Sequence, residues 1–531
     1  MSIRYGTVIG QANPEFFNFN IENREVRPSN YEYVQIEVEE TVGEDKEKVT
    51  VLSQVKGLYS SHPFYNIRTS PEAAQRMQQL GVPEGLLQII ATAKILGYLP
   101  IGSGGGGERE IRRPRTPPLP GTPVYRASDE LIMEFFRLPE KELPLEMGCL
   151  LHRPSVRIPI SGRELHRHTA ILAMTRYGKS YFAGKVMEEL LKKGATIITI
   201  DVHGDYINMV NHPDGVAHDF FRDKVTVYRP ESAEGIDLPH VKPLRFNVAS
   251  CDFAELTALT RIDGTLQMIV LRNVLNELRK DKQGAYSLED VIERLEEDMK
   301  DEKATEKERI FNIIRRLDDL KNRGIFSDYE TSIEEFFKPM HISDIFLSGL
   351  SSDEQDIFVW LILRKIFDAK FKKQPWARLP LFVFVEEAHR FAAPPEFGSG
   401  KYSREILARI AAEGAKFGLF LTVISQRPRK IDPDILSNCS NMAVLRVVNK
   451  NDQGQIQAAS ESFSEDLLAD LPALDQGEVV LVGPFVSVPV MIKTIERETQ
   501  HGGRTPDIYR LLQEAKSEAE REQMKKRSKI Y

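Results

Sequence analysis

Residues 168–206 constrain the fold of this chain more than any other segment. They read HTAILAMTRYGKSYFAGKVMEELLKKGATIITIDVHGDY. The pattern predicts a short apolar strand at 170–173, a tight loop closing on Gly178-Lys179-Ser180, a helix, and a second strand ending in Asp201. A phosphate-binding loop needs this order, because the strand fixes where the loop begins and the first amides of the helix hold phosphate oxygens. The segment therefore predicts an α/β fold that binds a nucleoside triphosphate.

Lys179 is expected to reach the β- and γ-phosphates of ATP, and the Ser180 hydroxyl to ligate Mg²⁺. The loop departs from the usual pattern, because Ala173 replaces its first glycine and the bulky Arg176 and Tyr177 precede Gly178. A chance match is the alternative, and the flanking strands together with a second motif argue against it. The predicted nucleotide-binding residues are Thr175, Arg176, Tyr177, Gly178, Lys179, Ser180, Tyr181 and Asp201.

The second motif is an apolar strand at 381–385 that ends in Glu386 and Glu387. Such a strand beside the phosphate loop delivers carboxylates to the nucleotide. We expect Glu386 to hold Mg²⁺, with Ser180, and Glu387 to polarise the attacking water as general base. A strand that ends at a solvated, charged turn is the alternative. A phosphate loop about 200 residues upstream favours the catalytic interpretation.

Polar residues also follow two other predicted strands. The strand at 418–424 ends in Ser425-Gln426, and Gln426 is a candidate to orient water or sense the γ-phosphate; a turn hydrogen bond is the alternative. Asp201 ends the strand after the phosphate-loop helix. Because side chains at the carboxyl edge of an open parallel sheet face its ligand, Asp201 is predicted to face the nucleotide.

Length and composition limit the remaining possibilities. A chain of 531 residues is too long for a single hydrophobic core. Its net charge of −7 excludes a positive potential over the whole surface, which would attract nucleic acid. Three scattered cysteines predict neither a zinc site nor a disulfide framework, as in a reducing cytosol. No run reaches the roughly 18 apolar residues of a membrane span. We expect a cytoplasmic protein without signal peptide or membrane contact.

The periodicity of the chain predicts five regions. Short alternating strands indicate a small N-terminal β-barrel over 1–150, with helical pieces near 71–81 and 85–90. Strands alternating with helices indicate a parallel core in two parts, 151–251 and 339–504. A charged helical insertion separates them at 252–338, and its two apolar stripes are predicted packing faces. A charged C-terminal helix follows at 505–531. The stripes comprise Leu271, Val274, Leu275 and Leu278, and Ile313, Ile314, Leu317 and Leu320.

With these motifs in place, the chain resembles the HerA family of hexameric DNA translocases, in the HerA/FtsK branch of RecA-like P-loop ATPases. The resemblance rests on IDVHGDY at 200–206, similar to the family's D-P-H-G-E-Y, on VEEAH at 385–389, and on KFG at 416–418 leading to ISQRP at 424–428. DPDILS at 432–437 and HGGRTPD at 501–507 are also similar to the family. The resemblance implies a RecA-like core with a helical insertion, preceded by the family's HAS barrel.

The family also has trans-acting arginines, which one subunit supplies to the ATP of the next. Arg167, ahead of the phosphate-loop strand, matches one such position. The helix before Lys416 usually reads close to A-R-I-A-R-E-G-R-K in the family, but here it reads ARIAAEGAK at 408–416. Two family arginines are alanine, so Arg409, Lys416 and Arg427 are the candidates for a second trans-acting cation. An ordinary surface ion pair is the alternative for each.

The resemblance implies a homo-hexameric ring that moves double-stranded DNA and works with a partner. That partner is a NurA-like nuclease in DNA end processing, or a sirtuin-like or nuclease effector in anti-phage defence. Two other classes stay open from the residues alone. One is a protein-pumping or conjugative-coupling ATPase of the same superfamily, and the other is an assembly scaffold that binds nucleotide without hydrolysing it.

Overall fold

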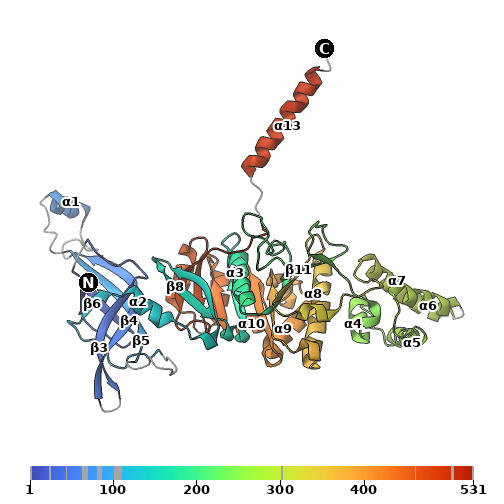
Figure 1. Cartoon of the computed structure of the whole chain (residues 1–531), viewed down its shortest axis with the longest axis horizontal. Coiled ribbons are helices and arrows are strands. Elements are labelled where there is room, and N and C mark those ends of the chain that lie inside the picture. Colours follow the sequence, from blue (N-terminus) through green and yellow to red (C-terminus); the bar gives the residue numbers. More distant parts are fainter. Residues whose placement is uncertain are drawn as a thin grey trace. The chain divides into compact units, whose positions relative to one another are not determined.

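The computed structural model describes residues 3–22, 25–42, 45–62, 70–79, 87–100, 111–300, 303–460, 462–503 and 508–528. The chain divides into two compact units (Figure 1). The first comprises residues 1–165, 441–446 and 462–495. The second comprises residues 166–440, 447–461 and 496–531. The motif predicted at 501–507 lies outside the described residues from 504 onward.

The first unit begins with a closed β-barrel, as the sequence predicts. Its strands follow the order β1-β2-β5-β4-β3-β6, and every pairing around it is antiparallel. Alternate side chains point inward, so β2 reads as a regular alternation of buried and less buried residues. The strands are β1 (Arg4–Ile9), β2 (Phe16–Ile21), β3 (Tyr33–Val42), β4 (Asp45–Ser61), β5 (Gln88–Tyr98) and β6 (Pro123–Arg126).

The helix predicted at 85–90 is wrong where the structure describes it, because residues from Gln88 onward belong to β5. Ala91 and Ala93 of this strand are fully buried in the barrel core. Their small side chains fit the interior of a narrow barrel, and this packing overrides their helical propensity.

The rest of the first unit is a second antiparallel sheet with short helices. β16 pairs with β17, β17 with β18, β18 with β7 and β7 with β8. These strands are β7 (Pro144–Leu150), β8 (Arg153–Ser161), β16 (Asn441–Val444), β17 (Glu478–Val482) and β18 (Val490–Thr494). The helices are α1 (Pro71–Gln79), α2 (Asp129–Phe136) and α12 (Glu465–Asp470).

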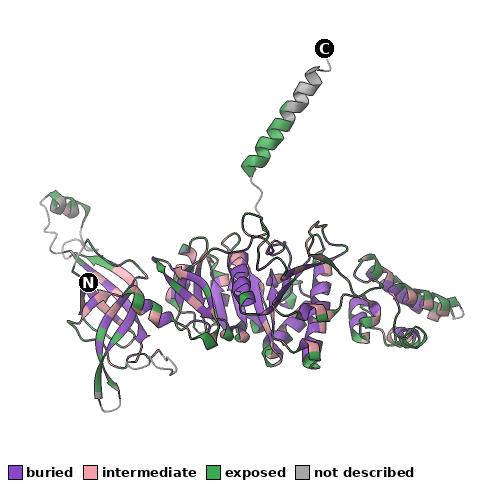
Figure 2. Cartoon of the chain, viewed as in Figure 1, coloured by how far each residue is buried: buried purple, intermediate pink, exposed green. Residues whose placement is uncertain are grey.

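A parallel sheet forms the centre of the second unit, in the order β12-β11-β13-β10-β14-β15-β9. β9, β10 and β13 are buried along their whole length. Figure 2 draws the buried residues of the central strands in purple. Helices on such a sheet leave no face open to solvent, so its strands read as nearly continuous apolar runs. The strands are β9 (Thr169–Leu172), β10 (Thr196–Asp201), β11 (Val225–Pro230), β12 (Val241–Leu244), β13 (His341–Phe346), β14 (Leu381–Val385) and β15 (Leu419–Ser425).

The acid-bearing strand β14 is separated from the phosphate-loop strand β9 by β15, which pairs with both. The carboxyl ends of β9, β15, β14 and β10 still meet at one edge, since all four strands run in parallel. This is the predicted RecA-like core.

Helices pack around the parallel sheet of this unit. α3 packs on β9, β10 and β15, and α9 packs on β15 and on α8. The helices of the core are α3 (Lys179–Lys192), α8 (Ser352–Phe371), α9 (Ser403–Glu413), α10 (Pro433–Ser437) and α11 (Lys450–Ala459).

The region predicted as a helical insertion contains α4 (Phe253–Thr260), α5 (Thr265–Asp281), α6 (Leu288–Lys300) and α7 (Ala304–Asn322). α5, α6 and α7 pack against one another. Both predicted stripes are confirmed as packing faces, because their residues are buried on α5 and α7. The last helix is α13 (Ile508–Ser528), which exposes Tyr509 and Leu512. None of the described helices is long and apolar enough to cross a membrane.

Candidate functional site: a phosphate loop facing two carboxylates

The predicted phosphate loop connects β9 to α3. Gly178 caps α3 with a φ of 96°, a left-handed conformation that glycine adopts without a Cβ clash. Arg176 also has a positive φ, 68°, and is exposed. Gly178 has no side-chain oxygen and therefore does not cap the backbone amides of the first turn of α3. These amides point toward the loop. This arrangement suits phosphate oxygens.

Lys179, the first residue of α3, lies between the two predicted catalytic acids. Its Nζ is 2.9 Å from Oε2 of Glu386 and 3.0 Å from Oε1 of Glu387. Both glutamates are buried, at 1% and 3% exposure. Burial disfavours the charged ammonium, but the two carboxylates outweigh it and raise the pKa of Lys179. The Ser180 hydroxyl lies 3.4 Å from the same ammonium.

Glu387 is held by groups from three segments. Its backbone φ is 48°, so the chain turns sharply directly after β14. Gln426, at the tip of β15, donates its amide to both carboxylate oxygens of Glu387 at 3.2 Å. Nδ1 of His389 lies 3.2 Å from the carboxylate, and burial lowers the pKa of His389 to about 4, so its ring is neutral. The hydroxyl of Thr175 donates to Gln426, which links the phosphate loop to the acid.

Asp201 has a different set of contacts. Its carboxylate accepts hydrogen bonds from the backbone amides of His203, Gly204 and Tyr206 at 3.1, 2.8 and 2.9 Å. Burial and the neighbouring Asp205 raise the pKa of Asp201 to about 7, against the opposing effect of the backbone amides. The Asp201 carboxylate is hydrogen-bonded to the turn after β10. Its contact with the nucleotide stays a prediction.

The two arginines predicted to act in trans lie away from the carboxyl edge of the sheet. Arg167 is exposed and directly precedes the amino end of β9, about 13 Å along four strand residues from the loop. The Arg409 guanidinium lies 4.4 Å from the Phe367 ring centroid, near the end of the helix that leads into β14. Both arginines therefore lie toward the amino edge, whereas Glu386 and Glu387 lie at the carboxyl edge.

Tyr181, the remaining predicted nucleotide contact, meets a segment that the motif search did not assign to the site. Its hydroxyl accepts a hydrogen bond from the backbone amide of Arg497 at 2.8 Å, and its ring packs edge-on against His501. Residues 496–503 therefore lie along the start of α3, and we call this segment the strap.

A buried ion pair fixes the strap to α3. The Arg497 guanidinium, 3% exposed, donates to Oε1 of the fully buried Glu188 at 3.3 Å. The same carboxylate accepts the backbone amides of Glu498 and Thr499 at 3.1 and 2.9 Å. Gly184 makes room for this guanidinium, because a Cβ there would overlap it. Nothing in the local sequence of α3 signals this distant partner.

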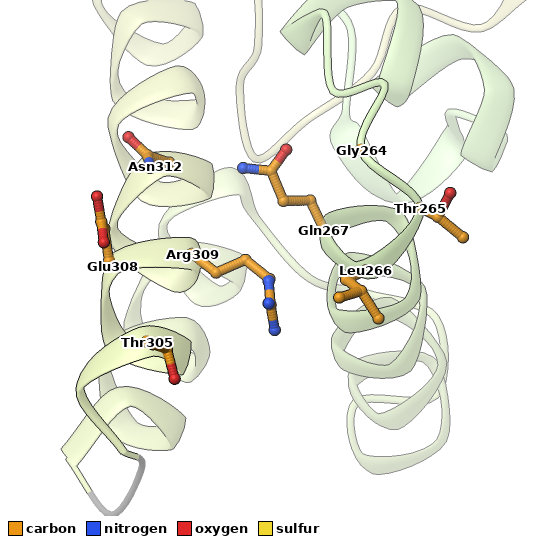
Figure 3. A pocket seen from close by; sticks show the side chains of 8 residues that line it. All are labelled: Gly264, Thr265, Leu266, Gln267, Thr305, Glu308, Arg309 and Asn312. Atoms are coloured by element: carbon orange, nitrogen blue, oxygen red, sulfur yellow. The ribbon is translucent and has the colours of Figure 1, made fainter.

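A hollow in the surface of the helical insertion is separate from these residues. It has a volume of about 520 Å³ and opens between the first turns of α5 and α7 (Figure 3). The side chains of Gln267 and Arg309 extend into it from opposite helices (Figure 3). Its lining residues are Gly264, Thr265, Leu266, Gln267, Thr305, Glu308, Arg309 and Asn312. The predicted nucleotide residues are not among them.

Comparison with known proteins gives a consistent family. Residues 145–366 match the family model described as helicase HerA, central domain. The chain is 30% identical over 416 residues to the probable helicase MJ1565 of Methanocaldococcus jannaschii, covering 76% of each. It is 29% identical to the DNA double-strand break repair helicase HerA of Pyrococcus furiosus, covering 76% of this chain and 77% of the relative.

A protein of the same name from Sulfurisphaera tokodaii is 28% identical over 537 residues, covering 97% of both chains. The family model includes the phosphate loop, and the match to the Sulfurisphaera tokodaii protein extends over nearly the whole chain. The chain belongs to the HerA helicase family of ATP-hydrolysing enzymes.

Proposed function

We propose that this protein is a motor that hydrolyses ATP to move along, or unwind, double-stranded DNA. The observation that carries the proposal is the cluster in which the phosphate-loop lysine, Lys179, lies within 3.0 Å of the two buried acids Glu386 and Glu387. Relatives that match most of this chain are named DNA double-strand break repair helicases. A duplex DNA substrate for this chain follows from that kinship.

Each residue of the cluster has a defined task in hydrolysis. Lys179 neutralises the β- and γ-phosphates, and the first amides of α3 hold their oxygens. Glu387 accepts a proton from the attacking water as the water adds to the γ-phosphorus and the bond from that phosphorus to the β,γ-bridging oxygen breaks, so that ADP leaves. Gln426 holds the Glu387 carboxylate through both oxygens and orients it toward that water.

The donor set fits Mg²⁺. Ser180 contributes a hydroxyl and Glu386 a carboxylate, and oxygen atoms of this kind are the ligands that Mg²⁺ prefers. Both groups are close to the Lys179 ammonium: the Ser180 hydroxyl lies 3.4 Å and the Glu386 carboxylate 2.9 Å from it. When bound, Mg²⁺ neutralises charge on the phosphoryl group that is transferred.

The active site is completed by a neighbouring copy of the chain. Glu387 follows β14 at the carboxyl edge of the sheet, whereas Arg167 precedes β9 at the amino edge. A head-to-tail arrangement brings the amino edge of one subunit to the nucleotide of the next, and such an interface forms a ring when its rotation closes. We infer a homo-hexamer in which Arg167, and Arg409 as second candidate, contact the neighbour's ATP.

The ring works in the cytoplasm with a nuclease or another effector, in DNA end processing or in anti-phage defence. The barrel at the start of the chain is the proposed docking surface for this partner. Affinity capture of native complexes, followed by mass measurement of the bound protein and of the ring, tests both proposals. A protein that stays monomeric with every nucleotide and DNA contradicts the ring.

The decisive test of the motor is ATP hydrolysis with and without linear duplex DNA of two unrelated sequences. We expect both duplexes to stimulate turnover, because contacts to phosphates ignore the bases. Stimulation should weaken between about 50 and about 200 mM salt as counterions compete for the phosphates. The Lys179→Ala variant is the control and should not hydrolyse ATP. The same turnover with and without DNA, in the presence of the captured partner, would contradict the proposed motor.

A further inference from the structure

Tyr206 contacts one of the proposed catalytic acids from inside the protein core. Its side chain is fully buried, and its hydroxyl donates a hydrogen bond to Oε1 of Glu386. The other oxygen of this carboxylate, Oε2, faces Lys179 at 2.9 Å. The tyrosine therefore determines which oxygen of Glu386 is directed toward the phosphate loop.

The turn after β10 fixes the position of Tyr206. Asp201 ends β10, and its carboxylate binds three backbone amides of this turn, including the amide of Tyr206 itself at 2.9 Å. Gly204 supports the bend with a φ of 78°. A short turn with three hydrogen bonds to one buried carboxylate leaves the tyrosine little freedom to move relative to the sheet.

The strap covers the same turn. The backbone amide of Gly502 donates to the carbonyl oxygen of Asp205 at 3.0 Å. A Cβ at Gly502 would overlap the carbonyl of Gly204, and a Cβ at Gly503 would overlap the side chain of Asp205. This close approach packs the turn between the sheet and the strap.

The phenol of Tyr206 is the donor of this hydrogen bond, and the Glu386 carboxylate is its acceptor. A protonated phenol that donates to a carboxylate forms a strong, charge-assisted hydrogen bond. Partners of this kind orient the groups that ligate a metal, and their loss typically lowers metal affinity or activity by about 10- to 100-fold.

We propose that Tyr206 is a positioning residue that orients Glu386 toward the Mg²⁺ of MgATP, with Asp201 as the support that holds Tyr206. This inference rests on the proposed function, because it takes Glu386 as a magnesium ligand. It assigns Asp201 an indirect role, through the turn, in place of direct contact with the nucleotide.

Tyr206→Phe tests the inference, since it removes the hydroxyl and keeps the ring that fills the core. The measurement is the rate of ATP hydrolysis as a function of free Mg²⁺ at saturating ATP. We expect the Mg²⁺ concentration for half-maximal rate to rise about 10- to 100-fold. A purely structural role for the tyrosine would change the unfolding temperature and leave this concentration where it is.

Tyr228→Phe is the matched control. Tyr228 on β11 is also buried, and its hydroxyl donates to a carboxylate, that of Glu335, at 3.1 Å, but this pair lies outside the site. We expect wild-type Mg²⁺ dependence from this variant. The same dependence in Tyr206→Phe as in the wild type would overturn the inference and leave the proposed function standing. Hydrolysis that survives Lys179→Ala would instead contradict the proposed function.

Discussion

Gln426 donates its side-chain amide to both carboxylate oxygens of Glu387, at 3.2 Å each. The same side chain accepts a hydrogen bond from Thr175 in the phosphate loop. One amide at the tip of β15 thus joins the proposed phosphate-binding loop to Glu387, the proposed general base. This connection spans 251 residues of sequence between Thr175 and Gln426.

Replacing Gln426 with alanine should slow hydrolysis more than it weakens nucleotide binding. The substitution frees the Glu387 carboxylate from its orienting donor, and misplacement of a catalytic base costs about 100-fold in rate. Steady-state kinetics and equilibrium binding of a fluorescent ATP analogue measure the two effects separately. Equal losses in binding and rate would show that Gln426 acts on the nucleotide and not through Glu387.

Lys179→Ala should abolish turnover and also destabilise the second unit. The substitution leaves Glu386 and Glu387 buried beside each other without a cation, and an uncompensated buried charge costs about 3–5 kcal/mol. Urea unfolding without nucleotide measures this cost. Adding Glu387→Gln to the variant removes one of the two charges and should recover part of the stability. A double variant as unstable as the single one would refute this electrostatic explanation.

Arg167→Ala subunits should inhibit wild-type subunits in mixed rings. In the proposed arrangement each variant subunit withdraws a cation from its neighbour's ATP, so hydrolysis should fall faster than the fraction of wild-type chains. Arg163→Ala provides a control, because Arg163 is an exposed arginine of the same 3-10 helix and its guanidinium pairs with Glu142 at 3.1 Å. Activity in proportion to the wild-type fraction for both variants argues that Arg167 serves only its own chain.

Gly184→Ala should destabilise the protein although alanine favours helices by about 1 kcal/mol. The added methyl group meets the buried Arg497 guanidinium, which Glu188 holds in place, and such overpacking costs about 1–3 kcal/mol. Gly454→Ala on α11 is the control, since a Cβ there meets no atom within 4 Å. We expect the control to gain stability in thermal unfolding. An equal gain in thermal stability at both positions would mean that the strap shifts to make room for the methyl group.

His168→Asn should weaken the loss of stability at acidic pH. Burial lowers the pKa of His168 to about 4 from 6.5, and its Nδ1 accepts the Leu421 amide at 2.9 Å. Between these pH values the unfolded chain binds the extra proton, so the free energy of unfolding falls as pH drops from 6.5 to 4. The full contribution is on the order of 3 kcal/mol.

Asparagine suits this test because it offers an oxygen acceptor and tolerates the positive φ of 58° at position 168. Urea unfolding of both proteins at several pH values between 7 and 4 gives the comparison. Other titrating groups, such as Asp201, are present in both proteins and cancel in the difference. Parallel pH profiles would exclude His168 as a source of the acid sensitivity.

The strands that surround the phosphate loop were predictable because they are buried on both faces. β14 falls on the predicted residues, β9 is shifted by one residue from the prediction, and β10 ends at Asp201 as predicted. β11 and β12 were not predicted, since the short segments Val225–Pro230 and Val241–Leu244 contain lysine, arginine and proline among few apolar residues. Their pairing depends on the edge offered by β13, which no local pattern reveals.

In the candidate site, too, some residues could be predicted from the sequence and others could not. Lys179, Ser180, Glu386 and Glu387 follow from strand ends and spacing, and the structure brings these four together. The hydrogen bond from Tyr206 to Glu386 joins residues 180 positions apart, and only the folded topology shows it. A carboxylate at a strand end, such as Asp201, looks the same in sequence whether it faces a ligand or the backbone.

The pairing of Arg497 with Glu188 sets a condition on how the chain matures as it leaves the ribosome. Before Arg497 is synthesised, the buried Glu188 has Lys185 of the same helix as its cation, at 3.4 Å, and lacks the Arg497 guanidinium and the two backbone amides of the strap. Nascent chains that stop short of the strap would carry every residue proposed to contact phosphate but not the partners that the strap gives Glu188 on α3. Nucleotide binding would then be weaker in chains that end before residue 496 than in chains that contain the strap.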